Sequence, residues 1–194
     1  MTTYMQPFTL ALNFDTGDLD PATSRIRRTV ADMAGMYGDR EAEARLAKAG
    51  DGLVYEVLQY DVPADNGQLI VCTTVIQPGK VGDEYFMTKG HFHAKRETGE
   101  VYVGLSGVGA LLLEVESEFD RQDMQPGTVA YVPPYWAHRT ANTGDEPFVF
   151  LAVYPADAGH DYGTIERDGF RYRLVERDGS PTLTPSKAGV AGGA

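Results

Sequence analysis

The chain has 194 residues, of which 42% are hydrophobic and 23% charged, so it is long enough to bury a core in one domain. Its formal net charge of −11 argues against nucleic acid or an anionic membrane surface as a partner. No basic residue precedes Arg25 and no apolar run approaches a membrane span, so we expect neither signal nor anchor, and a cytoplasmic location.

Residues 1–50 are expected to form a strand and a helical extension of the same domain. The apolar residues of 10–14 predict one short strand. Asp20 and Pro21 have the chemistry of a helix start, and the apolar spacing that follows predicts a helix ending at Gly35 or Gly38. A second helix is predicted from Asp39 to Gly50.

From residue 53 the pattern changes to short strands separated by turns, which indicates an antiparallel sandwich or barrel over residues 51–176. The predicted strands are residues 53–60, 69–76, 99–105, 110–116, 118–123, 128–132 and 148–154. Residues 164–166 and 170–175 are expected to form a terminal hairpin, and residues 177–194 a flexible tail. The single cysteine, Cys72, lies in an apolar run and is expected to be a buried, inert thiol.

Two histidines, His91 and His93, are two residues apart, so on a strand their side chains leave from the same face about 6.5 Å apart. The polar stretch 94–99 can reverse the chain and return Glu100 beside them on a neighbouring antiparallel strand. His138 follows a second turn. Three imidazoles and one carboxylate predict a mixed nitrogen and oxygen site for Fe, Mn, Zn, Ni or Cu.

The order of these residues adds a second signal. GHFH, EVYVGLSG and GTVAYVPPYWAHRTAN follow one another, with Gly107 seven residues after Glu100, Pro133 six after Gly127 and Asn142 four after His138. This set resembles the two-part pattern of the cupins. The resemblance implies an all-β fold, a double-stranded β-helix or jelly-roll barrel, here with the short N-terminal helical extension.

Longer tracts narrow the resemblance. EYFMTKGHFHAK and PPYWAHRTANTGDEPFVFLAVYPADAGHDYGTIERDGF are similar to the cupin-type, metal-dependent phosphoglucose isomerases, and the similarity runs from about residue 55 to residue 170. It implies an isomerase of glycolysis and gluconeogenesis that interconverts glucose 6-phosphate and fructose 6-phosphate as a homodimer. It also implies one divalent metal per subunit, which we expect to be Fe²⁺, with Mn²⁺, Zn²⁺, Ni²⁺ and Co²⁺ as alternatives.

The chemistry of the residues gives each candidate a role. Glu100 is the candidate base, because a ligand that uses one oxygen leaves the other free to take a proton. The resemblance implies phosphate contacts from Thr74, Thr88 and Gly90, and Lys89 would add a point charge. It also implies that His160, Tyr154 and Tyr162 contact the substrate. His160 or Tyr154 would then help to open the sugar ring. Tyr102 and Tyr135 flank metal ligands and are either core aromatics or partners of sugar hydroxyls. Arg139 follows His138 and is expected to pair with a carboxylate, the common partner of a partly buried arginine.

Two other classes of function stay open at this point. The same ligand set serves metal dioxygenases and decarboxylases among cupins, although those would not call for the tract from Thr88 to Gly90. A non-catalytic sugar-phosphate-binding cupin is the other alternative. The native metal, the choice between proton transfer through an enediol and hydride shift, and the use of mannose 6-phosphate are open as well.

Overall fold

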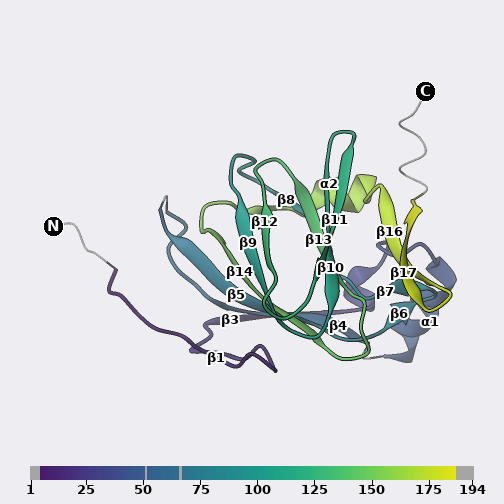
Figure 1. Ribbon diagram of the computed structural model, residues 1–194, viewed down its shortest axis with the longest axis horizontal. Helices are drawn as coiled ribbons and strands as arrows, with labels where there is room; N and C mark the ends of the chain where they lie inside the picture. The colour runs from purple at the N-terminus through teal and green to yellow at the C-terminus, as the bar shows by residue number, and fades with distance from the viewer. Residues whose placement is uncertain (1–4, 51, 66, 187–194) are drawn as a thin grey trace.

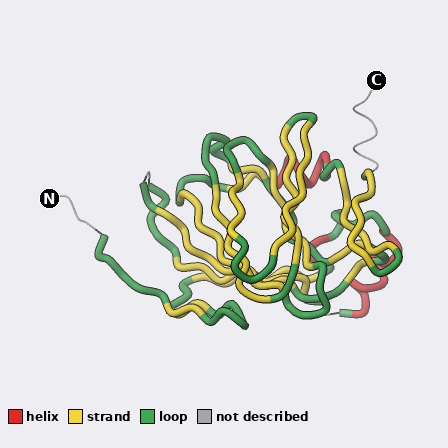
Figure 2. The backbone as a smooth tube through the Cα atoms, in the orientation of Figure 1, coloured by secondary structure: helices red, strands yellow, loops and turns green. Residues whose placement is uncertain are grey.

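The computed structural model describes residues 5–50, 52–65 and 67–186. Most of this chain is arranged in antiparallel strands, and helices are few and short (Figure 2). The predicted all-β class is therefore confirmed. Within the described residues, we find no helix long and apolar enough to cross a membrane.

The largest sheet has six antiparallel strands in the order β12-β9-β14-β5-β4-β3. Their bounds are Ser24–Thr29 for β3, Leu53–Tyr60 for β4, Leu69–Ile76 for β5, Glu100–Ser106 for β9, Val129–Val132 for β12 and Phe148–Pro155 for β14. A second sheet consists of β11 (Glu118–Met124), β10 (Gly109–Val115) and β13 (Ala137–Asn142). All seven predicted strands match these bounds to within one residue at each end.

The second sheet continues beyond β13 through an irregular segment. Isolated bridges join Met87 to Ala141 and His91 to His138, so residues 87–91 run antiparallel to β13. The chain then enters β8 (Phe92–His93), which pairs with β15 (His160–Asp161). This continuity brings the stretch before β8 alongside His138.

Small elements complete the fold, and Figure 1 shows the C-terminal hairpin and α1 together at one end of the molecule. The hairpin joins β16 (Tyr172–Arg177) to β17 (Ser180–Pro185), and β16 also pairs with β7 (Glu84–Tyr85), which pairs with β6 (Lys80–Val81). A short ribbon joins β1 (Ala11–Leu12) to β2 (Leu19–Asp20). The helices are the 3₁₀-helix η1 (Ala31–Met33), α1 (Arg40–Ala49) and α2 (Tyr162–Asp168).

The core consists of side chains from most of the strands: β9 and β12 bury alternate positions, whereas β10 and β13 bury consecutive ones. Leu111, Ile76, Phe148 and Phe150 are each at most 2% exposed. Cys72 is buried as predicted, and burial raises the pKa of its thiol. The core therefore holds the strands that carry the site in fixed register.

The first predicted helix is wrong. Residues 24–29 form β3, which pairs with the edge of β4, and Arg25 and Arg27 lie against Glu56 across that pair. An open sheet edge has unpaired backbone groups, and pairing with it outweighs a weak helical pattern. The second helix is confirmed as α1, with Asp39 Oδ1 accepting from the Ala42 N–H at 2.9 Å.

The predicted C-terminal hairpin is also wrong. Residues 164–166 belong to α2, which Asp161 caps by accepting from the Thr164 N–H. The hairpin forms one turn later, at Asp178 and Gly179, so residues 180–185 are a strand and not part of a loose tail. Residues 187–194 of the expected tail lie outside the described residues. The predicted N-terminal strand is present only as β1.

Candidate active site and metal centre

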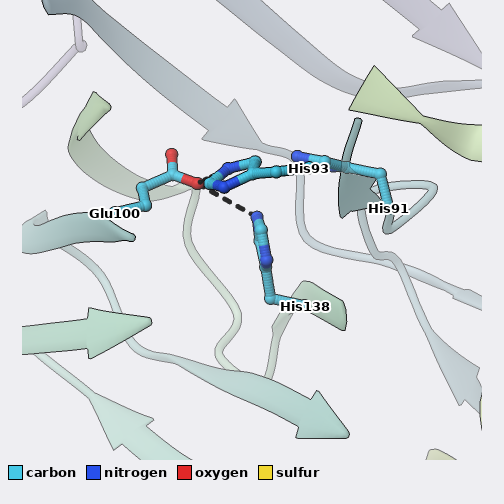
Figure 3. A group of neighbouring side chains, drawn as sticks. All are labelled: His91, His93, Glu100 and His138. Atoms are coloured by element: carbon cyan, nitrogen blue, oxygen red, sulfur yellow. Dashed lines mark hydrogen bonds and ion pairs between the residues drawn. The ribbon is translucent and has the colours of Figure 1, made fainter. Parts of the chain in front are cut away.

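Four predicted ligand residues converge from separate elements of the fold (Figure 3). We call His91, His93, Glu100 and His138 the ligand group. His91 ends the segment that pairs with β13, His93 lies in β8, Glu100 begins β9 and His138 lies in β13. The turn after His93 reverses the chain, with the Thr98 N–H donating to the Lys95 carbonyl at 3.2 Å. The structure thus brings together the residues that the spacing predicted.

The distances in the ligand group fit a metal ion. One ligand atom from each residue lies within 4.8 Å of the others. Glu100 Oε2 is 3.0 Å from His138 Nε2 and 3.2 Å from His93 Nε2. Atoms that share one ion at about 2.1 Å are separated by roughly 3.0–3.4 Å in octahedral or tetrahedral geometry. These spacings are therefore those of neighbouring ligands.

His91 supplies an independent test of this fit. Its Nε2 is buried, and in the described part of the chain it has no hydrogen-bond partner. A buried polar atom without a partner costs free energy, so such atoms are rare in folded proteins. A metal ion at the centre of the ligand group would give this nitrogen its partner.

Backbone carbonyls hold two of the imidazoles from behind. His93 Nδ1 is 3.0 Å from the Thr98 carbonyl oxygen, and His138 Nδ1 is 3.3 Å from the Trp136 carbonyl oxygen. When Nδ1 carries the proton and donates to these oxygens, Nε2 presents its lone pair to the centre. The ring orientations are thus set by the backbone before any ion binds.

The electrostatics of the ligand group favour an ionised Glu100 and a neutral His91, whereas hydrogen bonding to Glu100 raises the pKa of His93 against the effect of burial. Burial would raise the pKa of Glu100, but hydrogen bonds from His138 and His93 hold that pKa below its ordinary value. Burial, followed by the neighbouring histidines, lowers the pKa of His91 well below the usual range. Neutral nitrogen and ionised oxygen are the protonation states that a divalent cation requires.

A cavity of about 90 Å³ lies over the ligand group, and we call it the active-site cavity. Its volume is about that of three water molecules, at roughly 30 Å³ each, so it has room for the reacting end of a sugar but not for a whole one. Most of the predicted substrate-contacting side chains line it: Thr74, Thr88, Lys89, Gly90, Tyr102, Tyr154, His160 and Tyr162.

The tract from Thr88 to Gly90 forms part of this wall. Thr88 Oγ1 accepts from the Thr140 N–H at 3.1 Å, which leaves the hydroxyl proton free to donate. Gly90 has φ +76°, and its N–H has no acceptor among the residues described. Lys89 Nζ is 3.0 Å from Glu166 Oε1. The tract therefore presents two short-range donors to an anion and one lysine that is already paired.

Aromatic rings form the side of the cavity opposite this tract. His160 is exposed, lies opposite His93 across the β8 and β15 pair, and has its ring centroid 4.5 Å from that of His91. Tyr162 stacks on His160, and burial raises the pKa of Tyr162 to about 12. The Tyr154 hydroxyl donates to Gln59 Oε1 at 3.2 Å. A polar ring system thus lies where the cavity opens.

Tyr102 and Tyr135, whose roles the sequence left undecided, occupy different surroundings in the structure. Tyr102 is buried, stacks on Phe150 and lies edge-on to His138, so it is both a core aromatic and a wall of the cavity. Tyr135 is 53% exposed and is not among the described residues that line the cavity. Its N–H donates to the Arg96 carbonyl, in a turn with φ +75° that directs the side chain outward. The proposed contact of Tyr135 with substrate is therefore not supported.

Sequence reasoning missed several residues of the site. Tyr55 and Gln59 of β4 line the cavity, and neither follows a motif that marks it. Arg139 is 3% exposed and donates to the Lys89 carbonyl through Nε at 3.2 Å and Nη2 at 2.6 Å. We expected a carboxylate partner for this arginine, and a backbone carbonyl takes that place. Its position next to His138 was the one available signal.

Residues 27–185 match the family described as glucose-6-phosphate isomerase (GPI). Proteins named glucose-6-phosphate isomerase from Thermococcus litoralis and Pyrococcus furiosus are each 51% identical to this chain over 177 residues, which is 91% of this chain and 93% of each relative. A protein named putative glucose-6-phosphate isomerase 2 from Rhizobium meliloti is 41% identical over 191 residues, covering 95% of this chain and 96% of the relative.

Solved structures give a looser likeness. An oxalate oxidase in complex with the substrate analogue glycolate aligns with 58% of this chain and 56% of its own, at 12% identity and a TM-score of 0.49. That likeness is too loose to say anything about the site.

Proposed function

Because the chain belongs to the glucose-6-phosphate isomerase family, in its cupin-type form, we propose that the ligand group is the metal centre at which it interconverts glucose 6-phosphate and fructose 6-phosphate. The observation that carries the proposal is the buried His91 Nε2, which faces three further donor atoms beside the donors of residues 88–90. The dioxygenase and the non-catalytic alternatives are not favoured, because the family match covers most of the chain.

The reaction moves hydrogen between C1 and C2 of the open-chain sugar, and Glu100 is the residue to move it as a proton. Its Oε2 faces His93 and His138, while Figure 3 shows the other oxygen turned away from the histidines. Oε1 has no hydrogen bond to the residues described, so it is free to accept the proton and return it. A divalent metal, when bound, would stabilise negative charge on the enediol oxygens.

We assign the opening of the sugar ring and the proton transfers at its hydroxyls to His160 and Tyr154, which line the cavity. His160 lines the cavity, and although the residue is exposed, the desolvation of its ring where it packs against His91 lowers the pKa of the imidazole, so it is neutral and can accept a proton at neutral pH. The Tyr154 hydroxyl is held by Gln59, and burial raises its pKa, so it stays a proton donor. We assign both to the sugar hydroxyls, with Tyr162 and Tyr102 as walls against the ring.

The phosphate end is assigned to Thr74, Thr88 and the Gly90 N–H, with Lys89 as a weaker contributor because Glu166 already pairs with it. A hexose phosphate is larger than the present cavity, so we expect the segment with His160 and Tyr162 to move outward as substrate enters.

The donor set fits Fe²⁺, which is our proposal for the native metal, and it also accepts Mn²⁺, Zn²⁺, Ni²⁺ or Co²⁺. We further propose a cytoplasmic homodimer that folds as one domain. Exposed apolar side chains beside β1 and on the edge strand β12, among them Phe14 (62%) and Tyr131 (61%), support the dimer, because a second chain would remove them from water.

The test of this function is turnover of fructose 6-phosphate by the metal-loaded protein, with glucose 6-phosphate measured by a coupled dehydrogenase and dissolved oxygen followed in the same cell. Steady formation of glucose 6-phosphate without oxygen uptake is expected. Oxygen uptake that depends on the protein, with no isomer formed, would replace the isomerase with a dioxygenase.

A further inference from the structure

A second cavity, of about 310 Å³, lies among the residues that precede α1, the C-terminal half of α2, and β16. Four of the chain's 17 basic residues line it: Arg40, Arg139, Arg167 and Arg173. Met36, Ile165 and Phe170 supply apolar wall. In a protein with a net charge of −11, this is a local concentration of guanidinium groups.

Two donors on this wall are buried and unused. Arg173 Nε and the Tyr37 hydroxyl have no hydrogen-bond partner anywhere in the described ranges. Tyr37 is 1% exposed, and burial raises the pKa of its hydroxyl, which therefore stays a donor. Buried donors of this kind normally have acceptors, so their absence here indicates a ligand that brings acceptor oxygens.

The guanidinium of Arg173 is held on the wall without being neutralised at close range. Its Nη1 is 4.0 Å from Glu84 Oε2, which is beyond a hydrogen bond, and Glu84 Oε2 instead accepts from the Gly38 N–H at 2.8 Å. A Cβ on Gly38 would lie 1.2 Å from Arg173 Nη1, so only glycine leaves room for the guanidinium there. Arg173 is thus held by the chain around it and by a long ion pair with Glu84.

The acidic residues of the same wall are engaged elsewhere. Glu166 pairs with Lys89, and Asp168 takes two hydrogen bonds from Arg167 at 2.8 and 2.7 Å. These two carboxylates therefore neutralise Lys89 and Arg167 and not Arg173. Arg173 and Tyr37 are among the residues that line the cavity, and Glu84 lies beside them with a buried Oε1 that also has no partner in the described ranges; burial raises the pKa of Glu84, which favours an uncharged carboxyl next to an anion.

We propose that the second cavity binds a small phosphorylated molecule, with the phosphoryl oxygens on Arg173 and the Tyr37 hydroxyl and the rest of the molecule against Met36, Ile165 and Phe170. A phosphoryl group offers three acceptor oxygens and up to two charges, which matches a planar guanidinium with free donors. The volume is that of a small-molecule site and too small for a macromolecular partner. The active-site cavity is a competing phosphate site, so the test must separate the two.

The experiment is equilibrium dialysis of inorganic phosphate against the metal-loaded protein. Two phosphates per chain are expected for the wild type. Arg173→Gln should weaken one of them by roughly tenfold or more, because it removes the charge that is free to pair. Tyr37→Phe should weaken the same one by less, and it removes only an oxygen without a partner, so the fold should stay intact.

Two controls locate the effect. Arg177→Gln changes the same charge on the same strand, where Arg177 is exposed and pairs with Asp83, and it should leave both phosphates bound. Thr88→Val should weaken the other phosphate alone. Thermal midpoint and isomerase turnover should stay near wild type in Arg173→Gln and Tyr37→Phe, which shows that the variants fold.

Three results would overturn the proposal. The first is a single phosphate per chain that Arg173→Gln does not weaken. The second is an equal loss in Arg177→Gln, which would make the effect one of general charge. The third is malonate displacing the Arg173-dependent phosphate as well as phosphate itself does, because the site would then select any dianion and not a phosphoryl group.

Discussion

Glu100 has two carboxylate oxygens in different surroundings, and this difference separates its role as a ligand from its role as a base. Oε2 is within 3.2 Å of two imidazole nitrogens, and Oε1 is turned away from them. Both roles follow from one side chain at the first position of β9. Glu100→Gln keeps the shape of the side chain and removes its basicity, so it separates the role as a ligand from the role as a base.

Glu100→Gln should retain a coordinating oxygen but lose the proton acceptor. We expect turnover to fall by about 100-fold or more, while the metal content falls much less. Metal analysis and steady-state kinetics on the same sample make the measurement. Glu84→Gln changes another buried glutamate outside the active-site cavity and should leave turnover nearly unchanged. A parallel loss of metal and turnover in Glu100→Gln would reduce Glu100 to a ligand.

Thr88→Val removes one hydroxyl that faces the cavity and keeps the side-chain shape. A hydrogen bond to a charged oxygen contributes about 1.5–3 kcal/mol, so KM for fructose 6-phosphate should rise about tenfold or more, with the metal content unchanged. Because the contact is short-range, the ratio of the two KM values should change little over a salt series. Thr182→Val on the distant hairpin is the control. An unchanged KM would remove Thr88 from the phosphate site.

The residues of the ligand group could be predicted because their spacing along the chain is itself the pattern of a metal site. His91, His93 and His138 follow from strand periodicity and from their order in the chain. The substrate contact of Tyr135 stays a prediction without support from the structure, because the residue lies in a turn with φ +75° and is not among the described residues that line the active-site cavity. Arg139 was seen but given the wrong partner, because a backbone carbonyl as acceptor leaves no trace in the sequence.

Arg139 connects two elements, the strand β13 and the irregular segment 88–90. Its guanidinium donates twice to the Lys89 carbonyl and lies 4.5 Å from the centre of the Phe170 ring. A Cβ on Gly90 would lie 2.7 Å from Phe170 and 3.0 Å from Arg139, so the glycine is packed against this pair. The segment 88–90 is therefore held from behind by Arg139, the residue that follows His138.

Arg139→Met should free this segment while keeping an apolar side chain of similar length. The buried Lys89 carbonyl would lose both donors, at a cost of about 1–3 kcal/mol in the free energy of unfolding. We expect a lower thermal midpoint and a higher KM for fructose 6-phosphate, with less change in kcat and in metal content. Arg121→Met is a comparable arginine on β11, away from the site. If Arg139→Met is destabilised but its KM is unchanged, the arginine supports only the fold.

At the element scale, the sequence predicted the central strands and missed both ends. Strands with alternating side chains at the core are set by local pattern, as in β4, β5 and β14. β3 and β17 exist because a partner strand lies beside them, and α2 forms where Asp161 caps a short segment. Such elements depend on tertiary pairing, which a local window does not contain.

The whole molecule is acidic, yet its substrate is an anion, so recognition must be local. The donors proposed at residues 88–90 would act over hydrogen-bond distance, whereas the exposed charges behind the net charge of −11 are largely screened beyond about 8–10 Å. Composition argues against nucleic acid as a partner, which stays a prediction, and it gave no indication of the position of either cavity.

Association of two chains is the remaining prediction at this scale. Sedimentation equilibrium should give twice the mass of one 21.2 kDa chain at micromolar concentration. Phe14→Asp replaces the side chain with 62% exposure by a charge and should weaken the dimer if residues near β1 lie in the interface. Leu46→Asp, on the exposed side of α1 (38%), is the matched control. A wild type that sediments as one chain would end the proposal.

The central claim is that the ligand group holds a metal without which the chain does not isomerise sugar phosphate. The most direct measurement strips the protein with a chelator, verifies the loss of metal, and measures turnover of fructose 6-phosphate before and after adding single divalent metals. The account predicts no turnover in the stripped protein and recovery with one bound metal per chain, to an extent that differs among Fe²⁺, Mn²⁺, Co²⁺, Ni²⁺ and Zn²⁺. Full turnover by a protein shown to contain no metal would contradict it.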